Sequence, residues 1–155
     1  MQVESELVTK LTNKHYTISA AESCTGGLLA AAIVNVSGAS EVFECSYVTY
    51  ANKAKENLVY VKPDTLSRYG AVSSQTAEEM ALGCAKAAEA DVGLSITGIA
   101  GPDGGTADKP VGLVYIGCAI HGQVVTERHI FSGDRFSVRK QAVEAALDLA
   151  IHCLK

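Results

Sequence analysis

The stretch AESCTGG, residues 21–27, places a hydroxyl group and a thiol side by side where the chain changes character. It follows the apolar run YTIS and precedes an alanine-rich segment, so Ser23 is expected between a strand and a helix. A serine at such a point usually caps the helix, and its alternative role is that of a nucleophile. No neighbouring feature indicates an activated thiol at Cys24, so this side chain is expected to be buried filler.

Three residues after Ser23 suit the nucleophile. Thr25 adds a second hydroxyl group, and Gly26 and Gly27 allow the backbone to approach a ligand closely. Free N–H groups at the start of a helix suit a developing oxyanion or a bound phosphate. The stretch lacks the G-x-S-x-G pattern, so an α/β-hydrolase is not indicated.

A serine nucleophile needs a base, and no histidine of this sequence lies in a motif-like loop. Lys53 and Lys55 follow Tyr50 in the stretch TYANKAK, which is expected to form a helical turn. The two lysines point in different directions on such a turn, so only one would face a site. Desolvation can lower a lysine pKa enough for base catalysis. The alternative is that both lysines are solvated and that Tyr50 is a core residue whose hydroxyl group reaches solvent.

The segment TGIAGPDGGTADKP, residues 97–110, is too long and too rich in glycine to be only a connection. It contains neither the Walker A pattern nor the G-x-G-x-x-G pattern of dinucleotide sites. Thr97 and Gly98 end an expected strand and offer a hydroxyl group and an N–H to a ligand. Asp108 of the loop is expected to be an ordinary surface charge, and for Asp103 and Lys109 the choice between a surface charge and a role at the site stays open.

Two arginines follow the last expected strand in FSGDRFSVR. Arg135 and Arg139 are four residues apart, so on a helix they share a face. Paired guanidinium groups suit a phosphate or a carboxylate. An ion pair of Arg135 with Asp134 at the helix start is an equal alternative.

The composition excludes several classes of protein. The chain has 155 residues, 48% of them hydrophobic and 19% charged, which predicts one globular domain over residues 1–155. A net charge of −4 argues against nucleic acid as a partner. The sequence shows no signal peptide and no apolar run of the roughly 18 residues that a membrane span needs. Five scattered cysteines and four scattered histidines predict reduced thiols in the cytoplasm and no metal site.

Periodicity and turn residues predict the elements that must position these groups. Helices are expected over residues 2–14, 27–36, 52–58, 63–69, 75–90 and 135–154, and strands over 16–20, 42–50, 92–97, 111–120 and 124–132. Ser73 or Ser74 and Asp134 are expected helix caps, and His121-Gly122-Gln123 is an expected hairpin turn. This order predicts an α/β fold, a three-layer α/β/α sandwich with a mixed sheet. Ligands of such sheets bind beyond the carboxyl ends of the strands, where the polar segments lie.

Taken together and in order, these segments resemble the CinA C-terminal domain family, the nicotinamide-nucleotide amidohydrolases. The resemblance rests on AESCTGG, TYANKAK, GAVS, SITGIAGPDGGTADKPVG and FSGDR followed by VR. It extends from about residue 3 to residue 153, and its most specific part is TGIAGPDGG followed by KPVG. It implies the three-layer fold, and hydrolysis of nicotinamide mononucleotide (NMN) to nicotinic acid mononucleotide and ammonia in pyridine nucleotide recycling, without a metal or cofactor.

The resemblance also implies roles for single residues. The serine of the family's E-S-C-T-G-G motif is the nucleophile, which corresponds to Ser23. The lysine and tyrosine of its Y-x-N-x-A-K motif correspond to Lys55, the partner of the serine, and to Tyr50. Ala51 stands where many members have serine. Longer members carry an N-terminal molybdopterin-binding-like domain, so this sequence resembles the stand-alone deamidase, and the family implies a homo-oligomer.

The substrate-binding residues expected on this basis are Thr25, Gly26, Gly27, Thr97, Gly98, Arg135 and Arg139. Backbone N–H groups of the first five would hold the oxyanion or the phosphate, and one of the arginines the phosphate. Two alternatives remain open. One is a catalytically silent nucleotide-binding or competence-associated regulatory module, and the other is an amidase for another pyridine nucleotide or ribonucleotide.

Overall fold

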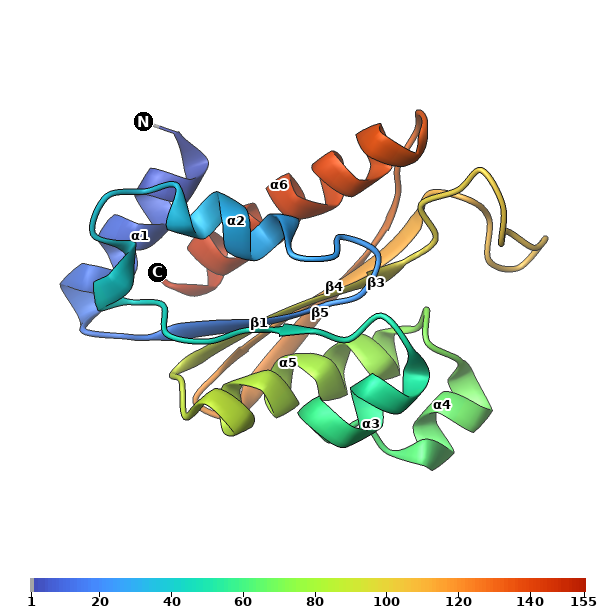
Figure 1. Cartoon of the computed structure of the whole chain (residues 1–155), viewed down its shortest axis with the longest axis horizontal. Coiled ribbons are helices and arrows are strands. Elements are labelled where there is room, and N and C mark those ends of the chain that lie inside the picture. The colour runs from blue at the N-terminus through green and yellow to red at the C-terminus, as the bar shows by residue number, and fades with distance from the viewer. Residues whose placement is uncertain (1) are drawn as a thin grey trace.

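A computed structural model describes residues 2–155, and within this range six α-helices surround a five-stranded sheet (Figure 1). The helices are α1 (Val3–Lys14), α2 (Leu28–Val34), α3 (Asn52–Val59), α4 (Pro63–Tyr69), α5 (Ser74–Ala88) and α6 (Arg135–Cys153). The strands are β1 (Ile18–Glu22), β2 (Tyr47–Val48), β3 (Val92–Gly98), β4 (Leu113–Ile120) and β5 (Gln123–Ile130). The strand order is β2-β1-β3-β4-β5, with β1 parallel to β2 and β3, and the other neighbours antiparallel. The predicted α/β fold with a mixed sheet is confirmed.

Helices cover both faces of the sheet. Figure 1 shows α1, α2 and α6 on one face and α3, α4 and α5 on the other. All five residues of β1 are buried, as expected for a strand between two helical layers. One hydrophobic cluster joins the sheet to the α1, α2 and α6 layer, and a smaller one around Val59, Met80 and Cys84 joins it to α3 and α5. The core therefore consists of two apolar layers separated by the sheet.

Local signals of the sequence fix several element ends. The Ser73 hydroxyl accepts the N–H of Thr76 at the start of α5, and the Asp134 carboxylate accepts the N–H of Ser137 at the start of α6. His121 and Gly122, with φ of 48° and 84°, form the turn between β4 and β5. Both residues are left-handed, as a two-residue turn of type I′ requires. The predicted caps Ser73 and Asp134 and the predicted hairpin are confirmed.

Two strand predictions need correction. The strand expected over 42–50 is reduced to Tyr47–Val48, with a single isolated bridge between Phe43 and Ile18. Phe43 packs against the core instead of extending the ladder, and β2 lies at the edge of the sheet, where only β1 can pair with it. The first strand runs from Ile18 to Glu22, two residues later than predicted, so it ends immediately before Ser23.

Gly83 allows α3 to lie against α5 with backbone in contact. A Cβ atom at this position would lie 1.7 Å from the carbonyl oxygen of Val59, the last residue of α3. Every side chain larger than hydrogen would therefore push α3 away from α5 and the sheet. The helix held in this way carries Lys55.

The last helix, α6, is the longest, with 19 residues. Val138, Ala142 and Leu149 of its predicted apolar stripe are buried against the sheet, while charged residues cover the outer side. Across the described residues 2–155, no helix combines the length and the apolar character that crossing a membrane requires.

Candidate active site

Ser23 lies at the carboxyl end of β1, in the middle of the sheet. Glu22 is in register with Ile96 of β3, and the N–H of Ser23 donates to the Ile96 carbonyl oxygen at 2.9 Å. This bond extends the parallel ladder by one step and fixes the backbone of the serine. The residue is 8% exposed, so little of it meets solvent.

Lys55 reaches the serine from α3, which lies on the other face of the sheet from α2, the helix that follows Ser23 (Figure 1). Its ammonium nitrogen Nζ lies 2.9 Å from Ser23 Oγ, 2.7 Å from the Thr49 carbonyl oxygen and 3.2 Å from the Tyr50 carbonyl oxygen. The lysine is 1% exposed, although lysine is rarely buried without a partner of opposite charge. Among residues 2–155, no carboxylate forms a salt bridge with it. All three of its hydrogen-bond partners are uncharged.

This environment sets the charge of the lysine. Desolvation by burial disfavours the ammonium form and lowers the pKa of Lys55 from 10.5 to about 8. A neutral amine keeps two N–H groups for the carbonyl oxygens of Thr49 and Tyr50 and presents its lone pair to the Ser23 hydroxyl. The same positions therefore suit both the protonated and the neutral lysine, as a general base requires.

Cys24 shows the opposite behaviour. Desolvation by burial raises the pKa of its thiol to about 11, despite the attraction of Arg139 and Lys55. The thiolate is therefore scarce at neutral pH, and the side chain is 6% exposed. Of the two adjacent candidate nucleophiles, the Ser23 hydroxyl group is the one that is hydrogen-bonded to an amine.

A cavity of about 290 Å³ opens onto Ser23. Of the residues predicted for the site, it is lined by Ser23, Tyr50, Lys55, Thr97, Gly98 and Arg135. These six residues come from four separate segments, which the carboxyl ends of β1 and β3 bring together. Ala71 and Val72 also line the cavity, and their residue types alone predict no role there. Their segment GAVS belongs to the family resemblance, and that was the only signal that could have found them.

Gly98 carries an N–H that the sheet leaves unpaired. Even-numbered residues of β3 bond toward β1, as Val92 N–H to Thr17 O and Ser23 N–H to Ile96 O show. The next bond of this series would join Gly98 N–H to the Ser23 carbonyl oxygen, and within the described part of the chain it is not formed. Because Gly98 lines the cavity, its N–H is a donor beside Ser23 that a ligand oxygen can accept.

Tyr50 and Arg135 form the rim of the cavity. The Arg135 guanidinium donates through Nη1 to the Gly101 carbonyl oxygen at 2.7 Å and through Nη2 to the Tyr50 hydroxyl at 3.2 Å. Tyr50 is 63% exposed, and its hydroxyl contacts the arginine rather than Ser23 or Lys55. Asp103 and Gly104 of the glycine-rich loop complete this side.

Four predicted residues lie outside the cavity lining: Thr25, Gly26, Gly27 and Arg139. The N–H groups at the start of α2 were expected to be free, and this prediction is wrong. The buried carboxylate of Glu22 accepts the N–H groups of Leu29 and Ala30 at 2.8 and 3.0 Å. The neighbouring N–H groups of Leu28 and Ala31 bond to the carbonyl oxygens of Thr25 and Gly27. This short helix therefore has its first four N–H groups occupied by the protein itself.

Comparison with known proteins gives the family. A family model described as the CinA C-terminal domain matches residues 1–154. The chain belongs to this family. A competence-damage inducible protein of Alkaliphilus metalliredigens is 53% identical over 146 residues, which are 94% of this chain and 36% of that protein. The CinA-like protein of Kosmotoga olearia is 51% identical over 152 residues, 98% of this chain and 37% of that protein. The chain thus spans little more than a third of the length of these curated relatives.

Solved structures of CinA-superfamily proteins have the same fold. The competence/damage inducible protein CihA from Agrobacterium tumefaciens superposes with a TM-score of 0.95 at 38% identity, over 100% of this chain and 98% of that one. A CinA-superfamily protein from Escherichia coli gives a TM-score of 0.92 at 37% identity, over 98% and 87% of the two chains. The arrangement of helices and sheet around Ser23 is therefore a CinA-superfamily arrangement.

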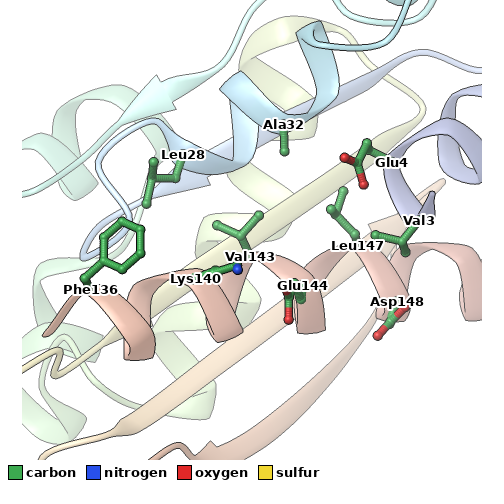
Figure 2. A pocket seen from close by; sticks show the side chains of 10 residues that line it. All are labelled: Val3, Glu4, Leu28, Ala32, Phe136, Lys140, Val143, Glu144, Leu147 and Asp148. Carbon is green, nitrogen blue, oxygen red and sulfur yellow. The ribbon is translucent and has the colours of Figure 1, made fainter. Parts of the chain in front are cut away.

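A second, larger hollow of this CinA domain lies elsewhere. Figure 2 shows it as a groove bounded by α1, α2 and α6, with Phe136 and Leu28 at one end and Val3 and Leu147 at the other. Its volume is about 470 Å³, and it shares no residue with the cavity at Ser23. We call it the α1–α2–α6 groove. In the described part of the chain, no group of three or more His, Cys, Asp or Glu side chains could hold a metal ion there or at Ser23.

Proposed function

We propose that the protein is an amidohydrolase that converts NMN to nicotinic acid mononucleotide and ammonia, with Ser23 as nucleophile and Lys55 as general base. The observation that carries the proposal is the buried Lys55 Nζ, 2.9 Å from Ser23 Oγ and without a carboxylate partner among residues 2–155. A buried lysine without a counter-ion costs stability, and a serine base is the role that such an amine suits. Family membership supports the substrate class.

The first half of the reaction forms an ester on the serine. Neutral Lys55 takes the proton of the Ser23 hydroxyl while Oγ attacks the carboxamide carbon of NMN. The tetrahedral intermediate then breaks its C–N bond, and the Lys55 ammonium gives its proton to the departing nitrogen, which leaves as ammonia. The nicotinoyl group of the mononucleotide remains bound to Ser23 Oγ.

The second half restores the enzyme. Water attacks the ester carbon, and Lys55, again neutral, takes one of its protons. Collapse of the second tetrahedral intermediate breaks the bond to Oγ, and the lysine returns the proton to the serine. Nicotinic acid mononucleotide leaves with its new carboxylate. The amine is neutral before each attack and charged before each departure.

The oxygen that becomes negative in both intermediates needs a donor. The unpaired N–H of Gly98 lies in the cavity wall beside Ser23, while the start of α2 is occupied by Glu22. A preformed N–H donor of this kind contributes on the order of 10²–10³ in rate. We therefore assign the oxyanion to Gly98 rather than to Gly26 or Gly27.

The rim of the cavity suits the phosphate of the nucleotide. Arg135 is exposed there, and its guanidinium forms hydrogen bonds but no salt bridge within residues 2–155. A phosphate oxygen is a stronger acceptor than the Tyr50 hydroxyl that Arg135 now contacts. Tyr50 would then be free to stack or bond against the substrate, while the pyridine carboxamide lies deeper, at Ser23.

The alternative is a regulatory module that binds a nucleotide without turning it over. The observation in its favour is that relatives are named competence-damage inducible proteins. A binding module, however, gains nothing from a buried lysine against a serine hydroxyl. The same cavity also suits an amidase for another pyridine nucleotide or ribonucleotide. We further expect the reaction to serve pyridine nucleotide recycling in the cytoplasm, and the protein to be a homo-oligomer.

Ammonia release from NMN tests the proposal. The natural chain, Ser23→Ala and Lys55→Ala are assayed at equal folded concentration, with chelator present. We expect release by the natural chain and at least a thousandfold loss in both variants. A matched control is Lys53→Ala, since Lys53 is an exposed lysine of the same helix and is expected to leave the rate unchanged.

Three outcomes would contradict parts of the proposal. Release that survives Ser23→Ala would remove the serine as nucleophile and indicate direct attack by water. Release from another pyridine nucleotide but not from NMN would support the alternative amidase. Calorimetric binding of NMN without any release would favour the regulatory module.

A further inference from the structure

Arg139 lies outside the cavity but contacts the segment that carries the nucleophile. We call Ser23–Gly27 the nucleophile turn. The Arg139 guanidinium donates through Nε to the Cys24 carbonyl oxygen at 2.9 Å and through Nη2 to the Thr25 carbonyl oxygen at 3.2 Å. We propose that Arg139 is a positioning residue for Ser23, not a ligand of the substrate phosphate. The inference rests on the proposed function for its kinetic test and stands on its own for its chemical test.

The turn needs this support because little else holds its middle. Among the described residues, the backbone of its three middle residues, Cys24 to Gly26, forms two bonds to other backbone groups, from Gly26 N–H to Ser23 O and from Leu28 N–H to Thr25 O. Gly26 and Gly27 have left-handed φ values of 58° and 110°, where glycine is the most freely adopted residue. Two successive glycines make a turn flexible unless its surroundings restrain it.

Arg139 restrains it by orienting two peptide planes. Within a trans peptide the carbonyl oxygen and the following N–H point in opposite directions. Fixing the Cys24 carbonyl toward Arg139 therefore turns the Thr25 N–H away from the arginine, and fixing the Thr25 carbonyl directs the Gly26 N–H back to the Ser23 carbonyl oxygen. A guanidinium presents its donors in one rigid plane, so both carbonyl oxygens are held by one group.

Glu22 and Arg139, the two charged residues at this turn, bind different backbone groups. The Glu22 carboxylate accepts N–H groups of α2, which the turn leads into, and Arg139 donates to carbonyl oxygens of the turn itself. Arg135, one helical turn earlier on α6, contacts Gly101 and Tyr50 at the cavity rim. Arginines four residues apart thus have different tasks: Arg135 faces the substrate, and Arg139 faces the backbone behind the serine.

The kinetic test compares Arg139→Lys and Arg139→Ala with Arg135→Ala, using NMN. For both Arg139 variants we expect kcat to fall by on the order of 10²-fold with KM changed less than about threefold, because a misplaced nucleophile slows chemistry more than binding. Arg135→Ala is expected to raise KM instead. Millimolar guanidinium ion should restore part of kcat to Arg139→Ala, which loss of folding would not allow.

The chemical test needs no substrate. A fluorophosphonate probe reacts with an activated serine, and its rate at Ser23 reports the position of the hydroxyl group relative to Lys55. We expect the rate to fall at least tenfold in both Arg139 variants. Lys140→Ala is the matched control, since this exposed cation is the next residue of α6 and lines the α1–α2–α6 groove, and its rate should equal that of the natural chain.

Each result has one meaning. Equal probe rates in natural chain and Arg139 variants would overturn the positioning role, as would a rise in KM with unchanged kcat. Slower labelling of Arg139 variants in a protein that does not hydrolyse NMN would support the positioning role and reject the substrate. Labelling of the natural chain that Lys55→Ala does not slow would reject the Ser-Lys pair.

Discussion

The cavity at Ser23 and the α1–α2–α6 groove differ in what they contain. The groove is the larger, about 470 against 290 Å³, and six apolar and four charged side chains of three helices line it. The smaller cavity holds a buried lysine, a serine hydroxyl and an unpaired N–H at the ends of two strands. Burial of groups that prefer water costs stability, whereas covering apolar walls gains it. A cavity that buries polar groups at a cost in stability is therefore a better indicator of a catalytic site than a cavity of large volume.

Arg135 and Phe136 show how close the two regions lie in sequence. They are adjacent at the start of α6, yet Arg135 lines the cavity and Phe136, 66% exposed, lines the groove. Successive residues of a helix point about 100° apart, so one helix start can serve two surfaces. Substitutions that act in one hollow and leave the other unchanged test whether the two are independent.

Gly98→Ala should have the largest effect. Its Cβ would lie 2.7 Å from Val114 Cγ2 and 2.8 Å from the Leu113 carbonyl oxygen, so the end of β3 must shift. We expect turnover of NMN to fall on the order of 10²–10³-fold, because the oxyanion donor moves. Gly117→Ala is the packing control, since its Cβ would meet Ser95 Oγ at 2.6 Å, and neither Gly117 nor Ser95 lines the cavity. Equal loss of turnover per folded molecule in both variants would contradict the assignment of Gly98.

Lys55→Met should change how stability depends on pH. In the natural chain the folded pKa is about 8 and the ordinary value 10.5, so between them the unfolded chain binds a proton that the folded chain does not. Stability of the natural chain therefore rises with pH across this window, by about 3 kcal/mol. The variant lacks this rise, so its free energy of unfolding relative to the natural chain should fall by that amount. Urea unfolding at several pH values measures the difference, and a constant difference would mean an ordinary lysine.

The rate of turnover should follow the protonation state of Lys55. Only neutral Lys55 can accept the serine proton, so kcat/KM for NMN should rise about tenfold per pH unit and level off above about 8. Initial rates in overlapping buffers measure the profile. A rate that is level down to about pH 6 would indicate a base other than Lys55.

Phe136→Ser should have the smallest effect. The side chain is mostly exposed at the end of the groove and contacts none of the groups at Ser23, so turnover should stay within about twofold and stability within about 0.5 kcal/mol. Thermal unfolding and the ammonia assay measure both. A large loss of turnover would show that the groove and the cavity act together.

The sequence predicted the fold where local signals were strong. Alanine-rich periodic segments and caps such as Ser73 and Asp134 gave the helices, and the interleaving of helices and strands gave the layers. The strand over 42–50 was wrong because β-branched and aromatic residues there pack against the core instead of pairing. Propensity does not distinguish these two uses of the same side chains.

The site was predicted unevenly. Ser23 and Lys55 are recognisable by type and by family resemblance, but their 2.9 Å contact depends on how two helical layers meet the sheet. Arg139 and Glu22 could not be placed, because both bond to backbone groups, and sequence carries no signal for the partner of such a bond. The N–H of Gly98 was available only from the register of β1 and β3.

Gly83 is a position, distant in sequence from the site residues, where a single mutation would inactivate the site. With the Val59 carbonyl oxygen where its Cβ would be, a single-base change that introduces a side chain at Gly83 would push the whole of α3 outward. Lys55 would withdraw from Ser23 while every residue of the site remained unchanged in the sequence. In such a variant the serine, the tyrosine and the lysine would all be present in the sequence. Activity would be lost because α3 and α5 could no longer pack together. Surveys of which relatives retain activity should therefore include this glycine.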